Sequence, residues 1–415
     1  MNWVKNLPQR RGERRGRRDE INFPSDFLCD LSSLCGEFLP RLSCLACMPN
    51  HQRNDSAMYL KSLYLRNFRN YAEAEVHFSP RLNVFHGDNA QGKTNLLEAI
   101  YLIATGRSFR SQHLNELIRA GETFFFLDAE IVRDNIPQRV KISFDGKNRR
   151  LEIDANTYSS FHPLLGLLPS VLYTPQDTEM ITGSPAIRRR FLNLHLAQSD
   201  PLYVHHLTRF WRAMKQRNCL LRTRSKESLD CWETEMAHSA TYILKARGEM
   251  IAELKEPLAE QSRFLSAERE LHELRFHPSQ SDTYLQQLQK NRSREADLGL
   301  TMTGPHRDDL ALLIETKPAR LFASEGQKRT AIAALRLAEW ERLSKRVEAP
   351  ALMAIDDLAL HLDEARQKLL RSRLEQLGQV FITTPFVPAT CQSDHLICIA
   401  NGSIHGMLYS ARLGS

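Results

Sequence analysis

Short alternations of apolar and polar residues open the segment from Met58 to about residue 155. Alternation with a period of two predicts strands that are buried on one face. The positions that carry it are Met58 and Leu60, Leu63 and Leu65, Val76 and Phe78, and the run 82–85. We therefore expect three strands before the first glycine-rich loop, which begins at Gly87.

The apolar spacing changes from two to helical after this loop. The helical positions are Leu96, Leu97, Ile100 and Ile103, and Gly106 is a suitable C-terminal stop. Residues 122–153 return to alternation, with turn residues at 134–135 and 145–146, which predicts an antiparallel meander. The first part of the chain thus contains a strand, a loop and a helix in direct succession.

Residues 186–291 are charged, rich in leucine and poor in proline, which predicts helices. No heptad repeat is sustained along them, so a long coiled coil is not expected. A compact helical lobe or a short arm fits this length. Further on, 351–355 and 379–383 are short continuous apolar runs typical of buried parallel strands, and a helix is expected between them around 364–377. The pattern as a whole predicts an α/β fold.

Composition narrows the function only slightly. Among 415 residues, 56 Lys and Arg stand against 49 Asp and Glu, a formal net charge of +7. This balance suits a phosphate-bearing partner such as nucleic acid, and it suits an ordinary basic protein equally well. The scattered cysteines predict a reducing, cytoplasmic location. The sequence has no run of about 18 apolar residues, so we expect no membrane span.

Residues 1–57 differ from the remainder of the chain. They hold four of the eight cysteines and a cluster of arginines between positions 10 and 18. A solvated tail is the expected state of such a cluster. We interpret 1–57 as an appendage, or as the result of a start codon assigned upstream of Met58.

The loop after the third strand matches the phosphate-binding pattern G-x-x-x-x-G-K-T. It reads Gly87, Asp88, Asn89, Ala90, Gln91, Gly92, Lys93 and Thr94, followed by Asn95. In this motif the glycines let backbone NH groups face phosphates, the lysine reaches the β and γ phosphates, and the threonine hydroxyl ligates Mg²⁺. The pattern predicts ATP and Mg²⁺ as cofactors, against the alternative of a glycine-rich loop with an exposed lysine.

Two carboxylates follow the apolar run 351–355. Asp356 is expected to hold Mg²⁺, and Asp357 to orient and deprotonate the attacking water, with Lys93 as the second catalytic residue. Two acids at a strand end can also form a turn or a helix cap. The phosphate-binding loop upstream favours the catalytic interpretation.

A third element begins at Ser324, which lies 32 positions before Asp356, and includes Gly326 and Gln327. A hydroxyl residue and a glycine just before an amphipathic helix can direct NH groups and the helix dipole at a phosphate. A helix N-cap without a ligand is the alternative. The spacing resembles the ABC ATPase superfamily, in which this signature reaches the γ-phosphate bound by a partner subunit.

From Met58 to about Thr384 the chain resembles the RecF family of bacterial recombination and repair ATPases. The blocks that carry the resemblance are 65–71, 87–95, 183–185 with 188–192, 216–218, 304–309, 324–329, and 356–357 with 362–363. The resemblance implies an ABC-type ATPase head of mixed sheet and helices plus a smaller helical lobe. The segments expected are the extension 1–57, a first head part 58–185 with the loop, a lobe 186–298, and a second head part 299–415.

The resemblance also implies an activity and partners. RecF-like proteins dimerise around ATP, bind DNA at single-strand gaps and junctions, hydrolyse ATP slowly, and help RecA loading together with RecO and RecR. The alternative is an ABC-type subunit of another machine, either a transporter or an SMC-like structural ATPase. Such a DNA repair protein is cytoplasmic and associated with the nucleoid.

Further site residues are implied by the resemblance alone. Gln176 falls where the Q-loop contacts the metal, and Asp363 where the D-loop senses the opposite subunit, although Asp363 can equally cap a helix. Asp357 stands where many ABC ATPases have Glu. Thr384 stands where transporters have His, which makes it a weak candidate for γ-phosphate sensing.

DNA contacts are the least determined part of the sequence. The basic clusters are 188–190, Arg66 with Arg69, and Lys328 with Arg329. A solvated face explains each cluster about as well as a DNA contact does. His306 and Arg307, in a polar Gly-Pro loop, fit a buried structural network as well as a catalytic role.

Overall fold

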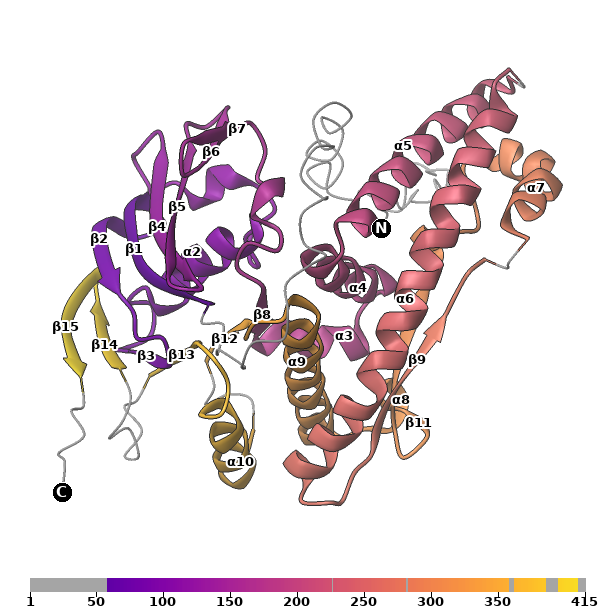
Figure 1. Cartoon of the computed structure of the whole chain (residues 1–415). Coiled ribbons are helices and arrows are strands. Elements are labelled where there is room, and N and C mark those ends of the chain that lie inside the picture. The colour runs from indigo at the N-terminus through magenta and orange to yellow at the C-terminus, as the bar shows by residue number, and fades with distance from the viewer. Residues whose placement is uncertain (1–57, 226, 281–282, 358–361, 386–394, 410–415) are drawn as a thin grey trace, which may run out of the picture.

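The computed structural model describes residues 58–225, 227–280, 283–357, 362–385 and 395–409 (Figure 1). The predicted extension 1–57 lies outside these residues. The first sheet is antiparallel, in the order β2-β1-β4-β5-β6-β7. Its strands are β1 (Met58–Phe68), β2 (Tyr71–His77), β4 (Phe125–Arg133), β5 (Ile136–Phe144), β6 (Arg149–Ile153) and β7 (Asn156–Tyr158). The expected meander is therefore present, and its hairpin turns at Asp134 and Asn135 through positive φ angles of 52° and 65°.

The second sheet is parallel except at one edge and runs β15-β14-β3-β13-β12-β8. Its strands are β3 (Leu82–His86), β8 (Ser170–Tyr173), β12 (Leu352–Ile355), β13 (Val380–Thr384), β14 (His395–Ala400) and β15 (Ser403–Tyr409). The two apolar runs predicted as parallel strands are β12 and β13, and they pair directly. This order places β13 between the strand that enters the glycine-rich loop and the strand that ends at Asp356.

Both faces of the second sheet are covered, which explains why its strands read as continuous apolar runs. Successive side chains alternate between the faces. Leu352 and Ala354 enter one core, whereas Met353 and Ile355 enter the other. The helix α2 (Lys93–Thr105) lies in the first core between the two sheets, against β13 and β8 on one side and β1 and β4 on the other.

The predicted stop of α2 is confirmed. Gly106 is the C-cap, with a left-handed φ of 70°, and its NH donates to the carbonyl of Leu102. A Cβ at this position would lie 2.7 Å from the Cβ of Phe161. Glycine is thus required here both for the turn and for the close approach of the next segment.

Helices form the other side of the molecule (Figure 1). They are α3 (Glu179–Thr182), α4 (Pro185–Ser199), α5 (Pro201–Thr223), α6 (Leu229–Ser266), α7 (Tyr284–Leu298), α8 (Ala319–Phe322), α9 (Glu325–Val347) and α10 (Glu364–Leu374). The pair α5 and α6 forms the arm, and the 38 residues of α6 span about 57 Å. A short arm fits the sequence prediction.

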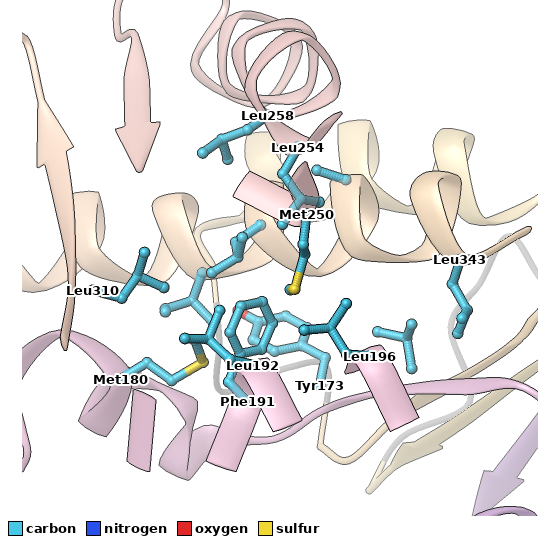
Figure 2. Packing of buried hydrophobic residues seen from close by; sticks show 14 of the residues in the cluster. Tyr173, Met180, Phe191, Leu192, Leu196, Met250, Leu254, Leu258, Leu310 and Leu343 are labelled. Carbon is cyan, nitrogen blue, oxygen red and sulfur yellow. The ribbon is translucent and has the colours of Figure 1, made fainter. Parts of the chain in front are cut away.

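One element of the predicted lobe is not helical. The strand β9 (His272–His277) pairs with β10 (Asp309–Ile314), which pairs in turn with β11 (Lys317–Pro318). The hydrophobic core that contains Met353 and Ile355 also crosses the predicted boundaries between the head and the lobe. In this core Met250, Leu254 and Leu258 of α6 pack with Leu192 and Leu196 of α4 and with residues of the parallel sheet (Figure 2). The lobe therefore shares its core with the head.

The helices can be compared with the length and apolar character of a membrane-spanning helix. Among the residues that the structure describes, no helix has the length and apolar character needed to cross a bilayer.

Candidate nucleotide-binding site

The glycine-rich loop connects the end of β3 to the start of α2. Gly87 and Gly92 have φ angles of 145° and 123°, which side-chain-bearing residues rarely adopt. A Cβ on Gly87 would lie 2.2 Å from the carbonyl oxygen of Ile399, and one on Gly92 would lie 2.8 Å from Asn70 Nδ2. Strand, loop and helix follow one another as the motif requires, and the loop is closely packed against its neighbours.

Lys93 is directed into the loop. Its Nζ donates to the carbonyls of Gly87 at 2.6 Å and of Asp88 at 2.8 Å, and the residue is only 8% exposed. Burial lowers the pKa of Lys93, and the carboxylates of Asp357 and Asp356 oppose this effect. The alternative of an exposed lysine is therefore excluded, and the Lys93 ammonium lies against two carbonyl oxygens of the loop.

Asp356 joins the loop to the second sheet. Its Oδ1 accepts hydrogen bonds from the hydroxyls of Thr94 and Thr383, both at 2.8 Å. Thr383 Oγ1 also accepts the backbone NH of Asp357 at 2.7 Å. The residues come together because β3, β13 and β12 are adjacent parallel strands that end at the same edge.

The donor set at this edge suits Mg²⁺. A threonine hydroxyl and a carboxylate are hard oxygen ligands, and Mg²⁺ usually takes one or two carboxylates together with substrate phosphates and water. Because Thr94 donates its proton to Asp356, its oxygen lone pairs can face a cation. Within the described ranges no group of three or more His, Cys, Asp or Glu side chains is arranged to hold a metal ion.

Neighbouring segments hold the loop in place. Asn70 Nδ2 donates to the carbonyl of Gln91 at 3.0 Å, and the hydroxyl of Tyr71 donates to the carbonyl of Gly92 at 3.0 Å. Asn95 Nδ2 in turn donates to Asn70 Oδ1 at 2.8 Å. The family block 65–71 therefore acts as a support for the loop, a role that its sequence alone did not reveal.

The turn between β14 and β15 supports the loop from the other side. The backbone NH of Asn401 donates to Gln91 Oε1 at 2.6 Å, and that of Gly402 donates to the Gln91 carbonyl at 2.9 Å. The Gln91 side chain thus contacts protein. The predicted contribution of Asn89, Ala90 and Asn95 to nucleotide binding stays a prediction.

Gln176 lies at the same edge as Asp356. It is exposed in a 3-10 turn, η3 (Pro175–Thr178), that follows β8, and β8 pairs with β12. The turn is fixed by Asp177, whose Oδ2 accepts the NH of Thr174 at 3.0 Å. This position is compatible with the predicted metal contact of Gln176, which stays a prediction.

The predicted signature begins α9. Ser324 is its N-cap and accepts the NH of Gln327 at 3.2 Å, while Gln327 Oε1 accepts the NH of Ser324 at 3.0 Å. Both side chains therefore form a capping box, as one of the two sequence interpretations expected. The remaining NH groups of the first turn, including that of Gly326, and the helix dipole are still directed outward at the helix start.

Two further predicted residues take structural positions. Asp363 is the N-cap of α10, and its side chain accepts the NH of Arg366 at 2.9 Å. Thr384 is 6% exposed on β13. The hydroxyl that contacts the Asp356 carboxylate and the Asp357 backbone NH belongs to Thr383, a role that sequence reasoning missed. The signal in the sequence was a polar residue at the end of an apolar strand.

In the basic cluster 188–190, Arg188 and Arg189 are held by protein partners, whereas Arg190 is exposed. Arg188 forms a bidentate ion pair with Asp309, with distances of 2.6 and 3.0 Å. Arg189 donates to the carbonyl of Asp308 at 3.0 Å. These two contacts fasten α4 to β10 and to Asp308 just before it.

Arg69 is engaged in the same way. It donates to both oxygens of the buried Glu98, at 2.8 and 2.7 Å, and to the Ser111 hydroxyl at 2.6 Å. Arg66 is exposed, with its guanidinium 5.7 Å from the ring centroid of Phe124. Of this pair, only Arg66 remains available to a phosphate.

His306 belongs to a buried network, one of the two alternatives that the sequence left open. Its Nε2 lies 3.1 Å from the carbonyl of Thr301, and burial lowers its pKa to about 3. Next to it, Arg247 pairs with Asp308 at 2.7 Å and donates to Asn193 at 2.8 Å. The block 304–309 thus ties the lobe to β10.

Comparisons with known proteins agree with this geometry. The sequence model described as "RecF/RecN/SMC N terminal domain" matches residues 59–403. The DNA replication and repair protein RecF of Protochlamydia amoebophila is 43% identical over 337 residues, which cover 79% of this chain and 94% of that protein. RecF of Chlamydia abortus is 36% identical, over 81% of this chain and 94% of that protein.

Solved structures show the same similarity. A structure of the recombination mediator protein RecF described as RecF-ATP in the RecFOR pathway has a TM-score of 0.80 and 28% identity, covering 86% of this chain and all of that one. The Smc head domain of Pyrococcus furiosus, bound to the C-terminal domain of ScpA, has a TM-score of 0.54 at 16% identity, covering 85% and 96%. The second match concerns the fold alone.

Proposed function

This chain belongs to the RecF family of DNA replication and repair proteins, ATPases of the ABC and SMC type, and from that premise we propose that it is an ATP-timed DNA clamp. Two copies close around ATP, hold DNA at single-strand gaps or junctions, and reopen after slow hydrolysis. RecO, RecR and RecA are the partners that the family implies, in the cytoplasm and at the nucleoid.

The observation that carries the proposal is the hydrogen bond between Thr94 and Asp356. It connects residues 262 positions apart and brings the phosphate loop to the carboxylate edge of the sheet. In the proposed reaction, residues 87–95 bind the phosphates through backbone NH groups, and Lys93 neutralises the transferring group. RecF structures described with ATP support the choice of nucleotide.

The carboxylates and Gln176 complete the half of the proposed site that one copy of the chain supplies to its own nucleotide. Thr94, Asp356 and Gln176 hold Mg²⁺, which when bound neutralises charge on the β and γ phosphates. Asp357 orients the attacking water and accepts its proton. The left-handed backbone of Asp357, with φ of 54°, supports this role, because strained residues cluster at functional sites.

The signature is proposed to act on the nucleotide of the second copy. Ser324, Gly326 and Gln327 stand at the start of a 23-residue helix, where a phosphate is stabilised. Immediately before it, Leu321 and Phe322 are 74% and 66% exposed, an apolar surface that a partner would cover. Both observations support a dimer that completes the site.

Hydrolysis measured with and without DNA tests the proposal. We expect the full chain to hydrolyse ATP slowly and to respond to gapped duplex more strongly than to blunt duplex. The control is Lys93→Arg, which keeps the charge but crowds the phosphates, and should lower turnover by roughly 100-fold or more. Turnover that neither DNA nor Lys93→Arg changes would contradict the proposal.

A further inference from the structure

Thr383 lies beside the two acidic residues of the proposed site. It lies at the end of β13, is 1% exposed, and contacts both acidic residues that follow β12. Its hydroxyl donates to Asp356 Oδ1 at 2.8 Å and accepts the backbone NH of Asp357 at 2.7 Å. A single hydroxyl thus joins the proposed cation ligand to the proposed base.

The chemistry of threonine suits this double contact. A hydroxyl has one proton to donate and two lone pairs to accept, so it can serve both neighbours at once. Branching at Cβ restricts χ1, which fixes the direction of the hydroxyl before any ligand binds. Valine has the same shape but neither hydrogen-bonding function, and serine keeps the function with less rigidity.

The hydroxyl acts on the Asp356 carboxylate and on the Asp357 backbone. Asp356 Oδ1 accepts from Thr94 and Thr383 together, and these two bonds help to orient the carboxylate. Asp357 holds a left-handed backbone that costs about 1–3 kcal/mol in a non-glycine residue. The bond from its NH to Thr383 stabilises this conformation and so determines where the Asp357 side chain begins.

We propose that Thr383 is a positioning residue for ATP hydrolysis, setting Asp356 for the cation and Asp357 for the attacking water. This inference rests on the proposed ATPase function. It predicts that removing the hydroxyl lowers kcat more than it lowers ATP affinity, because the phosphate-binding loop itself is untouched. It also predicts a higher Mg²⁺ concentration for half-maximal rate.

The test compares Thr383→Val with Thr383→Ser in the full chain. We expect Thr383→Val to lower kcat about 10- to 100-fold, the usual loss when a supporting group behind a metal ligand is removed. ATP affinity should change by less than about threefold, and Thr383→Ser should restore most of the rate, because serine keeps the hydroxyl. The matched control is Thr105→Val, since Thr105 is 2% exposed and its hydroxyl donates to Tyr101 of its own helix.

The outcomes separate this inference from the function on which it rests. If the wild-type chain does not hydrolyse ATP with Mg²⁺, the proposed function fails. If the wild type is active and folded Thr383→Val matches Thr105→Val in kcat and in Mg²⁺ dependence, Thr383 has only a packing role. Should Thr383→Val not fold, Thr383→Ala against Thr383→Ser makes the same comparison, and equal rates for these two overturn the inference.

Discussion

Lys93, Arg188 and His306 all carry chemistry that suggests a functional site, and their surroundings separate their roles. The Lys93 ammonium lies among the carbonyls of a loop that shapes a phosphate site. The Arg188 guanidinium is satisfied by Asp309 inside the protein. His306 is 8% exposed and faces a backbone carbonyl. Residue type alone could not distinguish the first from the other two.

His306 should make the fold sensitive to acid. Its pKa falls from 6.5 to about 3 on folding, because burial disfavours the charged ring, although the Thr301 carbonyl partly opposes this; Arg307, Arg189 and Arg247 lower the pKa further. Between these values the unfolded chain binds a proton that the folded chain does not, so stability falls as pH falls below 6.5. We expect a loss of up to about 2 kcal/mol between pH 7 and pH 5.

Urea unfolding at these two pH values measures the effect. His306→Gln keeps a donor for Thr301 but does not titrate, so its loss of stability between pH 7 and pH 5 should be smaller than that of the wild type. A residual loss is expected from His195, whose pKa is lowered by burial as well. Equal losses in the two proteins would show that His306 does not contribute.

The roles of some site residues could be predicted from the sequence, and the roles of others could not. The loop residues and Asp356 were predictable, because the motif places chemistry at fixed spacing along the chain. Thr383, Asn70 and Tyr71 were not predicted, since their roles depend on which strands are neighbours in the sheet. Arg69 and Arg188 resembled DNA contacts because their partners, Glu98 and Asp309, are distant in sequence.

At the scale of elements, α9 connects the signature to the turn η3. Arg336 of α9 forms a bidentate pair with Asp177, at 2.8 and 3.0 Å, and a second pair with Glu339 at 2.6 Å. Burial opposes the charge of Arg336, but the two carboxylates outweigh it and raise its pKa. The helix that begins at Ser324 and the turn that carries Gln176 are therefore held as one unit.

Replacement of Asp177 by Asn should weaken this unit. Arg336 would keep Glu339 but lose one charged partner, which should cost about 1.5–3 kcal/mol of unfolding free energy. The control on the same helix is Glu325→Gln, because the Glu325 side chain is 70% exposed in its pair with Lys328. Loss of this surface pair should lower the free energy of unfolding less than loss of the Asp177 pair. Urea unfolding compares the two variants. Equal costs would mean that the Asp177 pair contributes no more than a surface pair.

Most elements followed from local pattern, whereas their pairing did not. Alternation predicted the first sheet, and continuous apolar runs predicted β12 and β13. The strand β9 was missed because it sits in a charged, helix-like stretch and is stabilised by β10, more than 30 positions away. The order β3-β13-β12, on which the site depends, cannot be determined from spacing along the chain.

At the scale of the whole molecule, the site is assembled from distant parts of the chain around one parallel sheet. Its loop comes from the first part, and the carboxylates and Thr383 come from the last. The helix α9 contacts β8 of this sheet and α6 of the arm (Figure 1). The signature residues cap their own helix, and among the described residues no hydrogen bond joins Ser324 to the loop 87–94. Under the proposed function, the signature of a second copy contributes to this site.

The mass of the Asp357→Asn variant in solution tests this central claim most directly. This variant should bind ATP without hydrolysing it, so light scattering with Mg²⁺ and ATP should give twice the 47.8 kDa of a single chain, and with ADP a single chain. Adding Ser324→Arg, which places a bulky charge at the proposed contact, should return the ATP-bound mass to one chain. A mass of 47.8 kDa for Asp357→Asn at saturating ATP would contradict the clamp.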